Sequence, residues 1–309
     1  MAERKERMQL DPKGSIRVGS VSTFLTEMER FEPKKGFTYF FRGHSRFSHR
    51  LVPSIYRDPG WIANEDVLFK ELVLRCPNDF SGQESTFQSL VKMQHYSLPT
   101  RLLDITANPL VALYFACEHE GPQRENGEVV VFHIPNAEIK YFDSDTVSVI
   151  SNISRRPASF VLPDDELERA AFNQYPQIQY LLHEVKREKP YFEPLILRFH
   201  LESVVCVKPK LDNARVIKQD GAFLLFGMNG RKTDPATVPA GFLAAAAAKR
   251  LLVEPGKKVF IRKQLESLGL TQASIFPEID KVAEFIKRTY ATPSATAASE
   301  SKLAGSAAD

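Results

Sequence analysis

The sequence predicts an α+β fold, a single compact domain with a central mixed or antiparallel sheet flanked by helices. Helix-like segments concentrate towards the two ends of the 309-residue chain and strand-like segments towards its middle. Regular strand–helix alternation, which is typical of a doubly wound parallel sheet, is not visible. The contents of 43% hydrophobic and 26% charged residues are those of an ordinary globular protein, and the length allows one large domain or two small ones.

The first half of the chain predicts one buried strand and four helices. The strand is the aromatic run 37–42, which Gly43 ends. Apolar residues three and four positions apart predict the helices. Asn108 and Pro109 are typical of a helix start, because the amide can cap the helix and the proline lacks an N–H that would have no partner there. The four predicted helices cover residues 20–32, 64–76, 83–95 and 109–116.

The second half predicts most of the sheet, followed by helices. Strands are expected at 128–134, 144–150, 195–200, 204–207 and 221–226. Helices are expected at 164–175, 177–188, 257–268 and 277–290. Glycine, asparagine and proline make 227–241 a predicted loop. We expect a flexible N-terminus at 1–18, one domain over 19–290 with a C-terminal helical segment at about 256–290, and a disordered tail at 291–309.

Charge and cysteine usage exclude several classes of protein. A net charge of +3 and a pI near 8.6 are too mild to indicate nucleic-acid binding by themselves. The three cysteines lie far apart without zinc-ligand spacing, so no metal is expected. The sequence has neither the apolar core of a signal peptide nor a run of roughly 18 apolar residues. We therefore expect a cytoplasmic protein that does not bind membranes.

The stretch from Gln94 to Asp104 is the first candidate site. It places His95, Thr100, Arg101 and Asp104 within eleven residues, next to core-forming sequence. Polar groups in such a position need hydrogen-bond partners or cost roughly 1–3 kcal/mol each. If the segment turns helically, Arg101 and Asp104 share a face. The alternative is a buried polar buttress that holds the shape of the loop.

Phe41-Arg42-Gly43-His44 is the second candidate site. An arginine at the end of a buried strand offers a fixed fork of donors for phosphate or carboxylate. The adjacent glycine allows a ligand or another backbone to approach closely. The alternative is that Arg42 pairs with a core carboxylate such as Asp104.

Two further positions complete the candidate site. Tyr114 could stack on a ring, although its place in an apolar helix favours packing. Gln219 precedes a predicted strand, where it could orient a ribose or a water or simply form a turn. Phosphate-binding and hydrolase motifs such as GxxxxGK[ST], GxGxxG, HExxH and GxSxG are absent from the sequence.

These segments resemble the FRG-domain family, named for the Phe-Arg-Gly that stands here at 41–43. The block QHYSLPTRLLDITANPLVALYFA at 94–116 is similar to the second signature of that family, and QDGAF at 219–223 is similar to its third. LESLGLTQASIFPEID at 265–280 resembles a segment that often closes such chains. Ile105 replaces the usual aromatic and Ser97 the common glycine. The resemblance implies a bacterial or phage protein of conflict or defence systems.

A second likeness is to arginine-type ADP-ribosyltransferases, whose first motif is also an aromatic strand that ends in Arg-Gly. This likeness implies that Arg42 binds the phosphate of NAD, that Tyr114 stacks near nicotinamide, and that the strand after Gln219 carries the catalytic end. Such enzymes normally place a glutamate on that strand, and this chain does not. Asp220 or Glu202 could substitute for it.

The leading hypothesis is therefore an NAD-using enzyme that transfers ADP-ribose or cleaves NAD. Its alternatives are a non-catalytic module that binds a nucleotide, a phosphorylated peptide or a partner protein, and a toxin that acts on nucleic acid with His95 and His44 as acid and base. NAD is the cofactor considered, and the oligomeric state is left open. The expected catalytic residues are His95, Asp104 and Gln219. The expected cofactor-binding residues are Arg42, Gly43, His44, Thr100, Arg101 and Tyr114.

Overall fold

The computed structural model of the protein describes residues 15–31, 34–80, 82, 85–118, 125–163, 167–243 and 250–290. Residues 1–14 and the predicted disordered tail at 291–309 lie outside these ranges. Part of the predicted flexible N-terminus is ordered, because residues 16–18 pair with residues 251–253 as a parallel edge strand. Within the described residues, no helix is long and apolar enough to cross a membrane.

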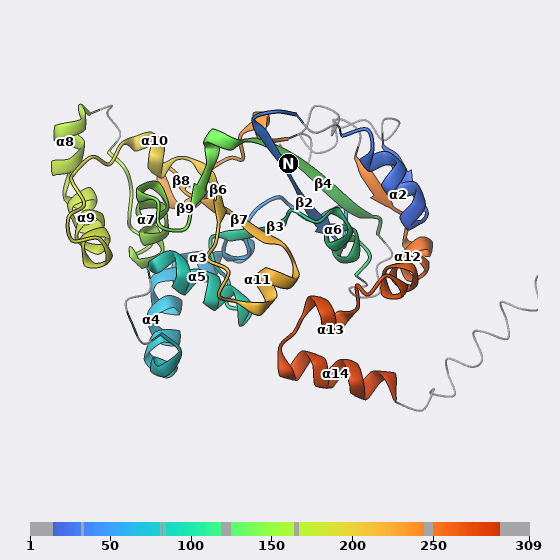
Figure 1. Ribbon diagram of the computed structural model, residues 1–309. Coiled ribbons are helices and arrows are strands. Elements are labelled where there is room, and N and C mark those ends of the chain that lie inside the picture. The colour runs from blue at the N-terminus through green and yellow to red at the C-terminus, as the bar shows by residue number, and fades with distance from the viewer. Residues whose placement is uncertain are drawn as a thin grey trace, which may run out of the picture.

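One eight-stranded mixed sheet runs through the molecule and confirms the predicted α+β class (Figure 1). Its order is β1-β10-β4-β2-β3-β7-β6-β5. The two outermost pairs are parallel and the five inner pairs are antiparallel. In that order the strands are Ile16–Val18, Leu251–Val253, Gly127–Pro135, Phe37–His44, Leu102–Thr106, Gly221–Phe226, Val204–Lys208 and Ile139–Tyr141.

The join between β2 and β3 is the weakest in the sheet. In the part of the chain that the structure describes, Phe41 and Thr106 are the one residue pair that links these strands. β2 pairs with β4 along its whole length, and β3 pairs with β7 along all of its own. The sheet is therefore two four-stranded halves joined at one point.

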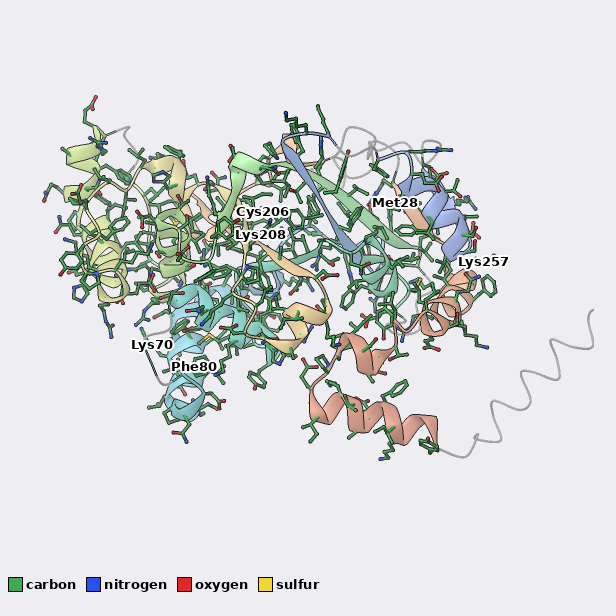
Figure 2. The ribbon with its side chains drawn as sticks, in the orientation of Figure 1. Met28, Lys70, Phe80, Cys206, Lys208 and Lys257 are labelled. Carbon is green, nitrogen blue, oxygen red and sulfur yellow. The ribbon has the colours of Figure 1, made fainter. Side chains whose placement is uncertain are left out.

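Each half of the sheet carries its own helical layer. β1, β10, β4 and β2 are covered by α2, α6 and α12, with Phe24, Val131 and Ile261 in a shared apolar core. α2 and α12 lie side by side, as Met28 and Lys257 show in Figure 2. Ser20 caps α2 by accepting a hydrogen bond from the amide of Thr23. These helices are Val21–Met28, Pro109–Ala116 and Pro255–Ser267.

The other half, β3, β7 and β6, packs against a larger helical layer at the opposite end of the molecule (Figure 1). Leu102, Leu225 and Val207 from the sheet meet Phe87, Ile150 and Leu181 from the helices in this core. Its helices are α4 (Glu65–Arg75), α5 (Thr86–His95), α7 (Asp145–Asn152), α8 (Arg169–Gln174) and α9 (Pro176–Glu188).

The opposite face of the sheet has a third core. Phe40, Phe132 and Leu224 pack there with Phe242 of a short 3-10 helix. A small hairpin, β8 (Met228–Asn229) with β9 (Arg231–Pro235), lies in the predicted loop 227–241, so that part of the loop prediction is wrong. The remaining helices are α3 (Pro59–Ala63), α10 (Arg198–Leu201), α11 (Ala214–Lys218), α13 (Gln272–Ile275) and α14 (Ile279–Thr289), with 3-10 helix η2 at Ser54–Arg57.

Two predicted strands are wrong for physical reasons. Residues 145–152 form helix α7, whose residues 147–152 are all buried. A helix buried on all sides has the same apolar composition as a buried strand, so periodicity cannot separate them. Residues 198–201 form helix α10 with Phe199 exposed to solvent. The strand β3 was missed, because the proline and the polar residues before it obscure a five-residue run.

Gly43 shows why the strand end needs glycine. A Cβ at this position would lie 2.0 Å from the carbonyl oxygen of Ala112 in α6. Gly127 on the neighbouring strand meets the carbonyl oxygen of Ala116 at the same distance. The two glycines therefore let α6 lie directly on the sheet, so the close approach predicted at Gly43 is to backbone.

Candidate functional site

A cleft of about 450 Å³ opens where β2 and β3 separate. Its volume lies in the usual range of ligand pockets, roughly 300–1,000 Å³. It is lined by residues of both strands, of η2, of α11 and of the segment before β7. The polar lining residues on which its chemistry depends are Arg42, His44, Arg57, Asp104, Arg215 and Gln219.

Arg42 spans the gap between the two strands. Its Nη1 donates a 2.5 Å hydrogen bond to the main-chain oxygen of Asp104 and lies 3.9 Å from the Oδ2 of that residue. Its Nε donates to Nε2 of His44 at 3.0 Å. Burial lowers the pKa of Arg42 to about 10, Asp104 opposes this change, and Arg57 adds to it. The guanidinium therefore stays charged near neutral pH.

His44 orients Arg42 by accepting its Nε hydrogen bond. Burial lowers the pKa of His44 to about 4, although Glu128 acts in the opposite direction. The imidazole is thus neutral near pH 7, and its Nε2 can accept the hydrogen bond from Arg42. Its Nδ1 lies 3.6 Å from Oε2 of Glu128, which in turn pairs with Arg250. Burial alone would raise the pKa of Glu128, but the neighbouring His44 and the hydrogen bonds from Arg250 lower it.

Asp104 presents the negative group of the cleft. On β3, Leu103 and Ile105 turn into the third core, and Asp104 between them turns to the cleft with 52% of its side chain exposed. The alternation of a strand explains this exposure. Glu118, two residues beyond α6, also lines the cleft. Glu118 could not be identified from the sequence, because only the spatial proximity of α6 to β2 reveals it.

The two carboxylates considered as substitutes for a strand glutamate lie elsewhere. Asp220 occupies a left-handed turn with φ 45°, and its Oδ2 accepts from Nδ2 of Asn108 at 3.4 Å. Glu202 pairs with Arg198 at 3.1 Å. Neither residue lines the cleft. Asp104 is therefore the carboxylate available beside Arg42.

Arg57 gives the cleft a second cation beside Arg42. It is exposed at the end of η2. Within the described part of the chain it makes no ion pair, and its charge lowers the pKa of Arg42. Two neighbouring guanidiniums repel each other, so an anion between them is favoured. Arg57 could not be identified from the sequence, because no motif surrounds it.

The comparisons with known proteins bear on this region. The model of the FRG domain family matches residues 38–125. The chain carries an FRG domain. No curated protein and no solved structure matches the chain. The FRG domain supplies Arg42, His44, Arg57, Asp104 and Glu118, while Arg215 and Gln219 come from outside the matched residues.

Arg101 of the FRG domain lies in the core and not in the cleft, which corrects its expected role in cofactor binding. It is fully buried, and its Nε donates to Oε1 of Glu65 at 2.9 Å. Its Nη1 donates to the main-chain oxygen of Phe226 at 3.0 Å, and Nζ of Lys232 lies 3.3 Å from Glu65. Because residues 102–106 form a strand and not a helical turn, Arg101 and Asp104 do not share a face.

Thr100 and Tyr114, also expected to bind cofactor, are buried in the FRG domain. The amide of Thr100 donates to the Oγ of Ser54 at 3.2 Å, and its hydroxyl oxygen accepts from the amide of Leu102. Tyr114 is 1% exposed, and its hydroxyl accepts from Nη2 of Arg262 at 2.9 Å. Thr100 shapes the loop and Tyr114 packs, so neither lines the cleft.

His95 and Gln219, expected to be catalytic, lie in different places. His95 lies beside the cleft, with Nε2 3.3 Å from Oε1 of Glu278 and Nδ1 3.3 Å from Nδ2 of Asn213. Burial lowers its pKa, and Glu278 opposes the change. Gln219 lines the cleft, although its Nε2 already donates to the main-chain oxygen of Ile275 at 3.1 Å. His44 and His95 therefore do not face one cleft as an acid–base pair.

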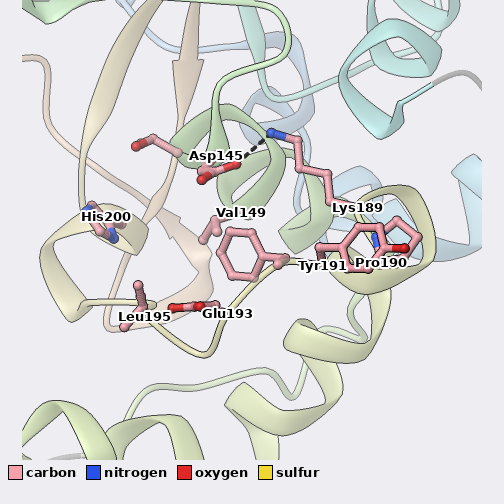
Figure 3. A pocket seen from close by; sticks show the side chains of 10 residues that line it. Asp145, Val149, Lys189, Pro190, Tyr191, Glu193, Leu195 and His200 are labelled. Atoms are coloured by element: carbon pink, nitrogen blue, oxygen red, sulfur yellow. Dashed lines mark hydrogen bonds and ion pairs between the residues drawn. The ribbon is translucent and has the colours of Figure 1, made fainter.

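A larger hollow of about 660 Å³ lies far from these motifs, between α7 and the segment that follows α9 (Figure 3). Nζ of Lys189 donates to Oδ1 of Asp145 at 2.7 Å across its rim. Lys189 and Asp145 thus pair with each other, and Tyr191 beside them is almost fully exposed. The smaller cleft has converging charges, so it is the better candidate site.

Proposed function

We propose that the cleft binds NAD and that the protein cleaves it or transfers its ADP-ribose. The observation that supports this most is the convergence of Arg42 and Arg57 beside the open carboxylate of Asp104. Guanidinium groups suit the pyrophosphate of a dinucleotide, because they donate in a fixed fork. A carboxylate at the same place suits the positive charge that develops on the ribose when nicotinamide leaves.

The reaction needs little more from the protein than binding and charge. The bond between the ribose C1′ and the nicotinamide nitrogen breaks, and nicotinamide leaves with the electron pair. The oxygen of water or of an acceptor group forms the new bond at C1′ and loses a proton to solvent. In this proposal Arg42 holds phosphate, His44 holds Arg42 in place, and Asp104 stabilises the cation.

The likeness to ADP-ribosyltransferases supports this assignment only at Arg42. Tyr114, which that likeness placed near nicotinamide, is buried against Arg262. Asp104 comes from β3 and not from the strand that carries the glutamate in those enzymes. An NAD-consuming activity also fits the conflict and defence systems that the family resemblance implies.

A non-catalytic binding module is the second candidate function. The contact between Asp104 and Arg42 favours it, because a carboxylate that serves mainly to orient an arginine would leave the cleft without a catalytic group. In that case the two arginines would capture a nucleotide or a phosphorylated partner and release it unchanged.

The test uses NAD labelled in both the nicotinamide and the adenosine parts. We expect nicotinamide release, a loss of NAD binding in Arg42→Ala, and retained binding with turnover reduced on the order of a hundredfold in Asp104→Asn. Asp145→Asn is the control, because that carboxylate is 73% exposed and lies at the distant hollow. Binding without turnover in the unaltered protein would indicate the binding module, and no binding by calorimetry would end the NAD proposal.

A further inference from the structure

The C-terminal segment, residues 272–287, packs against the wall of the cleft through the end of α13 and the residue that follows it. The main-chain oxygen of Ile275 accepts the hydrogen bond from Gln219, and the ring of Phe276 meets Phe115 edge-on at 5.9 Å. Gln219 and Phe115 both line the cleft. The C-terminal segment is therefore in contact with the site, although α14 itself extends away from the body of the molecule (Figure 1).

Arg215 connects this segment to the cleft. It belongs to α11, which Asn213 caps, and its side chain lines the cleft. The guanidinium lies 4.8 Å above the ring of Phe276, and its Nη1 lies 3.8 Å from Oε1 of Glu278. One cation is thus shared between the cleft and the C-terminal segment.

Glu278 is poorly satisfied in this position. Its side chain is 16% exposed, and within the described part of the chain neither carboxylate oxygen has a hydrogen-bond partner. Both its distance of 3.8 Å to Arg215 and its distance of 3.3 Å to His95 describe loose contacts. A buried carboxylate gains little from such contacts and loses its hydration, so the contact between Glu278 and Arg215 is easily exchanged for a better one.

We propose that Arg215 is a third anion-binding residue of the cleft and that Glu278 occupies it when no ligand is bound. A phosphate group in the cleft offers Arg215 a bidentate partner, which the loose carboxylate does not. Ligand binding then releases Glu278 and loosens the C-terminal segment. This inference rests on the proposed function only in that the cleft binds an anion, and it does not depend on NAD cleavage.

Binding of inorganic pyrophosphate, measured by calorimetry, tests the competition. Glu278→Gln removes the competing charge and should tighten binding about fivefold, at the lower end of usual coupling between sites. Glu284→Gln is the control, since that carboxylate is 55% exposed on α14 and pairs with Lys281. Arg215→Ala should weaken pyrophosphate binding. Unchanged affinity in Glu278→Gln or in Arg215→Ala, or no binding to any of the proteins, overturns the proposal.

Hydrogen exchange on the unaltered protein gives a second test that needs no substitution. Because coupling is reciprocal, saturating pyrophosphate should speed the exchange of amides in residues 272–287. Exchange that stays the same or slows there, with pyrophosphate bound, overturns the proposal. If exchange speeds up as expected but NAD is never cleaved, the catalytic assignment fails and the coupling stands.

Discussion

Arg42 and Arg101 both lie in the residues that match the FRG domain, yet their surroundings are opposite. Arg42 reaches across a gap between strands, contacts a carboxylate that is half exposed, and has a second arginine near it. Arg101 is sealed in the core and held by Glu65, with Lys232 on the same carboxylate. The two arginines therefore differ in their partners, since Arg42 is left open to the cleft and Arg101 is held by the core.

The largest effect that the comparison predicts is on the stability of Arg101→Ala. Removal of one partner from a buried pair leaves Glu65 with less compensation, so the free energy of unfolding should fall by about 3–5 kcal/mol. Chemical denaturation measures this value. Arg17→Ala is the matched control, because its ion pair with Glu254 is exposed and should contribute less than about 1 kcal/mol. Equal losses in Arg101→Ala and Arg17→Ala would mean that the buried ion pair contributes no more to stability than the exposed one.

The next effect is the pH dependence that His44 contributes. Its pKa is about 4 in the folded protein and near 6.5 when unfolded, so the unfolded chain binds the extra proton first as pH falls. The neutral His44 therefore contributes about 3 kcal/mol to the free energy of unfolding. This contribution is complete above about pH 6.5 and is lost as the pH falls from 6.5 to 4.

Between pH 6.5 and 4, the free energy of unfolding should therefore fall more steeply with decreasing pH for the unaltered protein than for His44→Gln. Chemical denaturation at several pH values measures this difference. The difference between the two proteins isolates His44, because burial also lowers the pKa of other histidines, such as His95 and His200. Parallel pH profiles for both proteins would contradict a neutral, buried His44.

A smaller loss is expected for Gly43→Ala. The added Cβ would clash with the carbonyl oxygen of Ala112, so α6 must move, at about 1–3 kcal/mol. Gly256→Ala is the control, because its Cβ would meet nothing within 4 Å and alanine favours the helix that contains it. Thermal unfolding should show opposite signs for the two changes. A neutral Gly43→Ala would mean that the contact with α6 does not require glycine.

The smallest effect on stability is expected for Arg42→Ala, at about 1 kcal/mol, since it loses mainly a hydrogen bond to His44 and one to a main-chain oxygen. Its effect on pyrophosphate binding should instead be the largest of the cleft variants. Denaturation and calorimetry on the same preparation measure both quantities. A loss of stability as large as that of Arg101→Ala would make Arg42 structural as well.

The sequence predicted the fold class and the elements with clear local signals. The aromatic run at 37–42, the capped start at Asn108 and the apolar spacing of 64–76 each contain their own evidence, and each element is present. β3 and α7 lack such local signals. The short strand β3 is determined by its pairing with neighbouring strands, and the buried helix α7 by its packing in the core. The eight-stranded order depends on contacts between distant segments, which one sequence does not reveal.

The candidate site was predicted in part. Arg42, Asp104 and Gln219, which the sequence marks as candidate residues, line one cleft. Arg101 was misplaced because three-residue spacing indicates one shared face only in a helix. Arg57 and Arg215 have no motif around them, so only the three-dimensional structure brings them to the cleft.

The single residue pair that joins β2 and β3 determines how the cleft of this protein is built. On a continuous sheet, the depth and the width of a cleft are set by the loops between strands, whose length and sequence can vary. Here the two halves of the sheet form the two sides of the cleft, and each half packs against its own helices. The cleft opens where the pairing between β2 and β3 ends. The width of the opening between β2 and β3 is thus set by the sheet itself, while η2, α11 and the segment before β7 line its rim.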